Sequence, residues 1–186
     1  MAAEEEFNQS PDEVPRPVSH WAPGDGGTAV YVDGSTGFRY GGEHGGVAVY
    51  WMGNFWGYAT NKLGPNRIEM AAYKCVFELI HIRPLIIHTD SSYVQRHGAK
   101  GKDTKIIGRD TKVIWTPRCS TPEMKLVDAL AKLCACTGEH YCGPRVRDIV
   151  SFTKEIQDQL SAIYDRHYGR GSPHDQSSVS NLARRS

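Results

Sequence analysis

Four acidic residues of this 186-residue chain lie close to the ends of predicted strands or helices. Asp33 ends the alternating stretch "AVYVD", and Asp90 ends the apolar stretch "LIIHTD". Glu69 and Asp128 lie near the starts of segments with helical apolar spacing. Taken singly, these acids have ordinary explanations as a turn residue, a helix cap, a partner of a helix dipole and a residue on a solvated helix face. They predict a functional site only if the fold brings them together.

Four carboxylates in one place would favour a divalent cation. Like charges at short range repel each other, so such a cluster makes physical sense only if a cation neutralises it. Oxygen ligands select hard ions such as Mg²⁺ or Mn²⁺. Two such ions about 3.5 to 4 Å apart stabilise the attacking and leaving oxygens of an in-line phosphoryl displacement. This chemistry predicts a phosphodiesterase with Mg²⁺ as cofactor, Mn²⁺ as a substitute and two ions per site.

Apolar periodicity predicts the elements that would position the acids. Five strands are predicted, near 28–33 and over 45–52, 54–60, 85–90 and 112–117. Helices are predicted over 67–80, 91–98, 122–135 and 145–168. The first three strands form a meander, the helix over 67–80 holds Glu69 in its first turn, and Pro122 suits the first position of its helix.

Strand direction predicts that the four acids meet at one edge of the sheet. The first and third strands of a meander point the same way, so the helix with Glu69 starts at the edge where Asp33 lies. A right-handed crossover makes the strand over 85–90 parallel to the first strand, which takes Asp90 to the same edge. If the fifth strand is also parallel, the helix after it places Asp128 there. Open α/β sheets bind ligands at this carboxyl edge.

Four motifs in this order resemble those of type 1 ribonuclease H domains, cellular and retroviral. They read "YVDGS", "NRIEMAA", "TDSSYV" and "LVDALAK", and the resemblance covers roughly Thr28 to Ala135. Four ordered motifs are far more specific than any one of them. The resemblance implies an α/β protein with an RNase H-like fold, a mixed five-stranded sheet flanked by helices, to which this chain adds a C-terminal amphipathic helix.

The resemblance also implies an activity, a partner and a set of site residues. The activity is endonucleolytic cleavage of the RNA strand of RNA/DNA hybrids, and the 2′-hydroxyl is the feature by which a protein can tell RNA from DNA. The implied catalytic metal ligands are Asp33, Glu69, Asp90 and Asp128. Four further residues occupy positions similar to those that approach the hybrid in the family, and they are Gly34, Ser35, Asn66 and Ser91.

The chain departs from the family pattern between the third and fourth motifs. Only "QRHGAKGKDTKIIGRDTK" fills the space where the family usually has further helices and a basic protrusion. Lys100 and Lys102 in this stretch, and Arg118 where many members carry a loop histidine, are predicted to contact substrate phosphates. The alternative function is a catalytically impaired RNase H-like module that binds nucleic acid or a protein partner.

Composition and terminal segments exclude other classes. Hydrophobic residues make up 39% of the chain, and no apolar run approaches the roughly 20 residues of a membrane span. The formal net charge of +1 gives no global basic field. The acidic N-terminal stretch has the features of neither a signal peptide nor a mitochondrial transit peptide, and the five cysteines are expected to be reduced thiols. We expect an intracellular protein of the nucleus or cytoplasm.

The predicted organisation is one catalytic domain with a helical addition and two tails. Disordered tails are predicted over 1–26 and 169–186, the RNase H-like domain over 27–142 and the C-terminal helix over 143–168. An apolar stripe along that helix could pack back on the domain, or could pair with a second copy of the chain or with another protein. The stripe consists of Ile149, Phe152, Ile156, Leu160 and Ile163.

The sequence offers a second possible metal site, but its spacing disfavours it. Zinc favours ligands of the types found at Cys134, Cys136, His140 and Cys142. Two cysteines that lie two residues apart on a predicted helix do not face each other, so packed cysteines are the better interpretation. His88, within an apolar strand, is interpreted as a satisfied interior residue.

Overall fold

The computed structural model describes residues 26–37, 43–98 and 111–169 of the chain. Lys100 and Lys102, for which substrate contacts are predicted, lie outside the described residues. The two predicted tails also lie outside them, except at residues 26 and 169. The strands are β1 Thr28–Ser35, β2 Gly45–Trp51, β3 Asn54–Thr60, β4 Leu85–Thr89, β5 Thr111–Trp115 and β6 Tyr141–Gly143. The helices are α2 Pro65–Leu79, α3 Ser92–His97, α4 Pro122–Thr137 and α5 Ile149–Tyr168.

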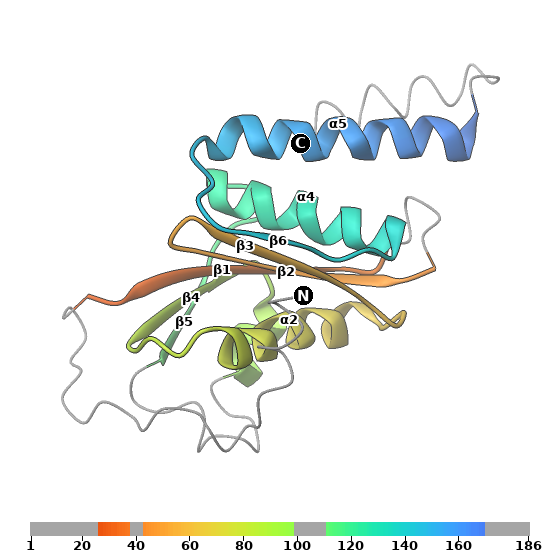
Figure 1. Ribbon diagram of the computed structural model, residues 1–186. Helices are drawn as coiled ribbons and strands as arrows, with labels where there is room; N and C mark the ends of the chain where they lie inside the picture. The colour runs from red at the N-terminus through yellow and green to blue at the C-terminus, as the bar shows by residue number, and fades with distance from the viewer. Residues whose placement is uncertain (1–25, 38–42, 99–110, 170–186) are drawn as a thin grey trace.

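A mixed sheet forms the centre of the molecule, with its strands in the order β5-β4-β1-β2-β3-β6 (Figure 1). β1, β2 and β3 form the predicted antiparallel meander. Its second turn uses Met52 and Gly53, which both have the positive φ that suits a two-residue hairpin connection. β4 lies parallel to β1, and β5 lies parallel to β4. Three parallel strands therefore end at the same edge.

The prediction of a five-stranded sheet was wrong, because β6 adds a sixth strand. β6 pairs antiparallel with β3, and Val146 just beyond it donates its N–H to the carbonyl oxygen of Gly53 at 2.9 Å. A three-residue edge strand is too short for an alternating pattern to reveal it. The extra strand lies on the side of the sheet away from β4 and β5, and the other five strands run in the predicted directions.

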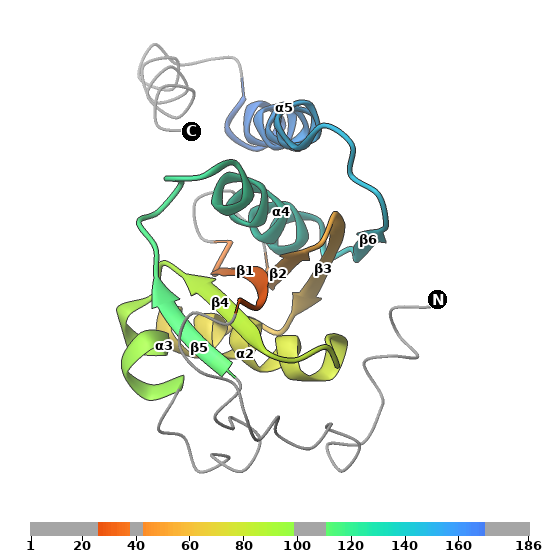
Figure 2. The same cartoon turned by 90° about the vertical axis from the view of Figure 1, so that its left-hand side faces the viewer.

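Helices cover both faces of the sheet. α2 packs on one face, α4 packs on the other, and α5 lies on the outer side of α4 (Figure 2). The apolar core therefore has two parts, one beneath α2 with Val32 and Val76, and one around α4 with Leu130 and Leu160. None of the described helices combines the length and the apolar composition needed to span a membrane.

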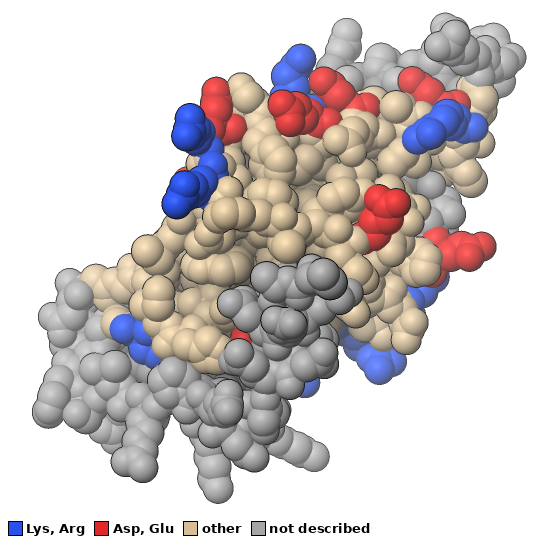
Figure 3. All heavy atoms as spheres, viewed as in Figure 1, with Lys and Arg blue, Asp and Glu red and all other residues tan. Residues whose placement is uncertain are grey.

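The apolar stripe of the C-terminal helix packs against the rest of the same chain. Ile156 and Leu160 of α5 pack against α4, and the ring of Phe152 lies 4.7 Å from that of Phe55 in β3. In the structure the helix therefore packs on its own domain, which is the first of the three predicted alternatives. The outer side of α5 mixes acidic and basic side chains (Figure 3), as the Lys154–Asp158 pair at 3.9 Å illustrates.

Candidate metal centre

Three of the four predicted acids converge at the carboxyl edge of the sheet. Carboxylate oxygens of Asp33, Glu69 and Asp90, one from each, lie within 4.8 Å of one another. We call these three residues the acidic triad. β1 and β4 run in parallel with Tyr31 opposite His88, so the chain reaches Asp33 and Asp90 at neighbouring positions two residues further on. The predicted parallel pairing of these strands thus brings the two aspartates together.

Glu69 reaches the aspartates because α2 packs very closely against the end of β1. A Cβ atom on Gly34 would lie 2.8 Å from the carbonyl carbon and oxygen of Ile68 and 3.0 Å from the nitrogen of Glu69. The absence of a side chain at Gly34 therefore permits the contact. The prediction that Glu69 lies in the first turn was wrong, because the helix begins earlier, at Pro65, a residue suited to that position.

Burial and mutual repulsion raise the pKa values of the acidic triad. Asp33 is 4% exposed, and its pKa is raised well above its ordinary value by burial and then by the charges of Glu69 and Asp90. The pKa of Glu69 is raised to about 8, by burial first and then by Asp90. Burial also raises the pKa of Asp90, although the nearby Arg118 partly offsets this. Without a cation, Glu69 therefore retains its proton near neutral pH, and a bound metal ion would displace that proton.

The donor set fits a hard divalent cation. All three side chains offer carboxylate oxygens, which are the ligands that Mg²⁺ and Mn²⁺ prefer. Asp33 accepts a hydrogen bond from the N–H of Gly34 at 2.9 Å. The Oε2 atom of Glu69 is buried and has no hydrogen-bond partner among the described residues. Because a buried polar atom without a partner is destabilising, a cation at the triad would supply the missing interaction.

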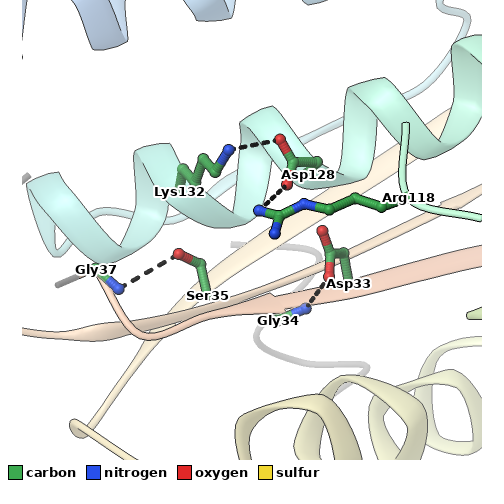
Figure 4. Close-up of polar contacts among 7 residues, drawn as sticks. All are labelled: Asp33, Gly34, Ser35, Gly37, Arg118, Asp128 and Lys132. Carbon is green, nitrogen blue, oxygen red and sulfur yellow. Dashed lines mark hydrogen bonds and ion pairs between the residues drawn. The ribbon is translucent and has the colours of Figure 1, made fainter. Parts of the chain in front are cut away.

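Asp128 lies outside the acidic triad and has two cationic partners. Its Oδ1 lies 3.2 Å from Nη2 of Arg118, and its Oδ2 lies 2.8 Å from Nζ of Lys132 (Figure 4). After burial and the triad acids, the charge of Asp128 also contributes to the raised pKa of Asp33, so the fourth acid is close enough to act on the site. The prediction that four acids meet is therefore confirmed for three of them, and the fourth, Asp128, lies beside the triad.

Two supporting residues were missed by the sequence analysis. Trp115 at the end of β5 lies opposite Thr89, and its indole Nε1 donates to the backbone carbonyl oxygen of Asp90 at 3.0 Å. The sequence offers one indication that Trp115 supports Asp90, namely its position at the carboxyl end of a strand predicted to border the site. Lys132 carried a clearer signal, because four residues separate it from Asp128 on one helix and such pairs face each other.

The residues predicted to approach the substrate differ in how free they are to do so. The hydroxyl of Ser91 caps α3, and that of Ser35 accepts a backbone N–H two residues further on. Gly34 is packed against α2. Asn66 in the first turn of α2 is exposed, and so is Arg118 beside Asp128. Among the described residues of this set, Asn66 and Arg118 are the most exposed, whereas Ser35 and Ser91 are half-buried.

Neither the cysteines nor the histidines form a second site in the part of the chain that the structure describes. The acidic triad is the only group of three potential ligand side chains there. Cys134 is buried in the core, whereas Cys142 is exposed on β6. The ring of His140 stacks on that of Tyr58 with their centroids 3.9 Å apart. His88 stacks on a tyrosine ring at 4.6 Å and its Nδ1 lies 2.9 Å from a threonine hydroxyl, as predicted for a satisfied residue.

The functional interpretation of this site depends on its geometry and on the motifs that form it. Comparison of the chain with models of known protein families gives no match, and comparison with curated proteins gives none either.

Proposed function

We propose that this chain is a divalent-metal-dependent ribonuclease H, an endonuclease that cleaves the RNA strand of RNA/DNA hybrids. The observation that carries the proposal is the convergence of Asp33, Glu69 and Asp90 from three separate elements, with a buried oxygen of Glu69 that lacks a protein partner. The mixed sheet with helices on both faces is compatible with the RNase H-like fold. The four ordered motifs support a hybrid as the substrate.

The residues at the site have distinct parts in the proposed reaction. The acidic triad would hold Mg²⁺ or Mn²⁺, and such cations, when bound, stabilise the attacking and leaving oxygens of phosphodiester hydrolysis. Trp115 holds the backbone of Asp90, which keeps that ligand in place. Arg118 stays protonated at all working pH values, so it binds phosphate and does not act as a general base.

One observation favours a second function, binding without catalysis. Both carboxylate oxygens of Asp128 are engaged by basic side chains, Arg118 and Lys132. If both ion pairs persisted with substrate bound, Asp128 would not act as a metal ligand. The chain would then be an RNase H-like module that binds nucleic acid or a protein partner without cleaving it.

A cleavage assay separates the two functions. A labelled RNA/DNA hybrid is incubated with the protein in Mg²⁺, in Mn²⁺ and in EDTA, beside single-stranded RNA, duplex RNA and duplex DNA. We expect cleavage of the RNA strand of the hybrid alone, with either metal and not in EDTA. Hybrid binding without cleavage would favour the second function, and cleavage of all four substrates would contradict the proposed preference for hybrids.

A further inference from the structure

We propose that Arg118 and Lys132 act as built-in counter-cations of Asp128 that limit the substrate-free site to one divalent cation. That cation binds at the acidic triad. Asp128 becomes a metal ligand only when Arg118 leaves it for a substrate phosphate. The inference rests on the proposed function, because it requires a cation at the triad and a phosphodiester as the substrate.

The geometry around Asp128 leaves little room for a metal ion in the present arrangement. Each of its two oxygens already has a cationic partner, at 3.2 Å for Arg118 and 2.8 Å for Lys132. The Asp128 side chain is only 11% exposed, so few other directions of approach remain. In Figure 4 the guanidinium of Arg118 lies between the carboxylates of Asp128 and Asp33. A cation that bridged the triad and Asp128 would have to take its place.

The charges agree with a single ion. With all acids ionised, the triad and Asp128 carry four formal negative charges, and Arg118 and Lys132 cancel two of them. The two that remain equal the charge of one divalent cation. A second divalent cation would therefore have to displace a basic side chain from Asp128, or would leave the half-buried site with excess positive charge.

Arg118 is the partner that can leave. Lys132 lies one helical turn from Asp128 on α4 and its side chain is only 23% exposed, so the helix keeps it beside Asp128. Arg118 lies in the connection between β5 and α4, and its side chain is 63% exposed. It contacts Asp128 through a single nitrogen, whereas a phosphate can accept two parallel hydrogen bonds from a guanidinium. A substrate phosphate thus offers Arg118 a better partner than the carboxylate does.

Counting bound Mn²⁺ in the absence of substrate tests this inference. The full-length chain is titrated while the electron paramagnetic resonance signal of free Mn²⁺ is followed. The wild-type protein should bind one ion per chain. The double variant Arg118→Ala/Lys132→Met should bind a second ion, with a dissociation constant about tenfold lower than for a second ion on the wild type, because two repelling charges are removed.

Three further variants connect the second ion to Asp128. Adding Asp128→Asn to the double variant should return the count to one. Arg118→Lys retains the charge and should also bind one ion. Lys125→Met, which removes an exposed lysine from the same helix, is the matched control and should behave like the wild type. If the double variant fails to fold, Arg118→Ala alone, at an exposed position, should strengthen binding of the second ion in the same direction by a smaller factor.

The outcomes distinguish this inference from the proposed function. Two ions of similar affinity on the wild type, or unchanged binding in the double variant and in Arg118→Ala, would overturn the inference and leave the nuclease proposal to the hybrid cleavage assay. No Mn²⁺ bound to the folded wild-type protein would overturn both.

Discussion

Replacing Glu69 with glutamine should stabilise the metal-free protein at alkaline pH and destabilise it by about 1 to 3 kcal/mol at acidic pH, where only the cost of the buried amide remains. Burial and then Asp90 raise the pKa of Glu69 from 4.5 to about 8, so the folded protein holds this proton more tightly than the unfolded chain does. The resulting stability is fully present below about pH 4.5 and is lost as the pH rises to about 8. Glutamine does not ionise, so the variant escapes this loss.

The expected magnitude follows from the two pKa values. The difference between 4.5 and about 8 corresponds to about 5 kcal/mol of stability lost from the wild type at high pH. The glutamine amide is also buried and will be imperfectly hydrogen-bonded, which costs about 1 to 3 kcal/mol. We therefore expect the Glu69→Gln variant to exceed the wild type by about 2 to 4 kcal/mol in free energy of unfolding at about pH 8.5.

Urea unfolding followed by circular dichroism measures this effect. Wild type and Glu69→Gln are unfolded in EDTA at several values between about pH 4.5 and about pH 8.5, with Glu155→Gln, at an exposed position on α5, as the control. The wild type and the control should lose stability with pH, and the Glu69 variant should lose much less. Adding Mg²⁺ at about pH 8.5 should stabilise the wild type more than the Glu69 variant. A Glu69 variant that follows the wild-type pH curve would refute the reasoning.

Three other substitutions test the positions around the site. Asp33→Asn should abolish hybrid cleavage and leave the metal-free thermal stability level or higher, since it removes a buried charge from the triad; assays of cleavage and thermal unfolding check both. Gly34→Ala should lower the free energy of unfolding by about 1 to 3 kcal/mol and weaken Mn²⁺ binding, because its Cβ would lie 2.8 Å from the Ile68 carbonyl; Gly64→Ala, with no neighbour within 4 Å, is the control. Trp115→Phe removes the indole N–H and should weaken Mn²⁺ binding about three- to tenfold with little change in melting temperature, as the side chain is 46% exposed.

Elements with a strong internal period could be predicted from the sequence. The meander, the strand before Asp90 and the amphipathic C-terminal helix all appear near their predicted ranges, because each carries its own pattern of buried side chains. β6 could not be predicted this way. Its three residues pair with β3 only because the connection after α4 returns to that edge, which is a tertiary property.

The candidate site likewise has some features that local sequence patterns predict and others that depend on the tertiary structure. Asp33 and Asp90 were predicted to meet because parallel strands place their carboxyl ends at one edge, and the structure has this arrangement. The ion pair between Arg118 and Asp128 depends on the course of the connection before α4, which no local pattern specifies. The bond from Trp115 to Asp90 likewise joins two strands that are adjacent only in the folded sheet.

The most direct test of the central claim is cleavage of a labelled RNA/DNA hybrid in Mg²⁺ by the wild type and by Asp90→Asn, purified in parallel. Asp90 is a proposed metal ligand, and its replacement by asparagine removes one carboxylate of the triad while β4 and β5, which hold this position, remain. We predict that the wild type cuts the RNA strand and that the variant binds the hybrid without cutting it. Equal cleavage by both proteins, or no cleavage by a wild-type protein that binds both Mn²⁺ and the hybrid, would contradict the claim.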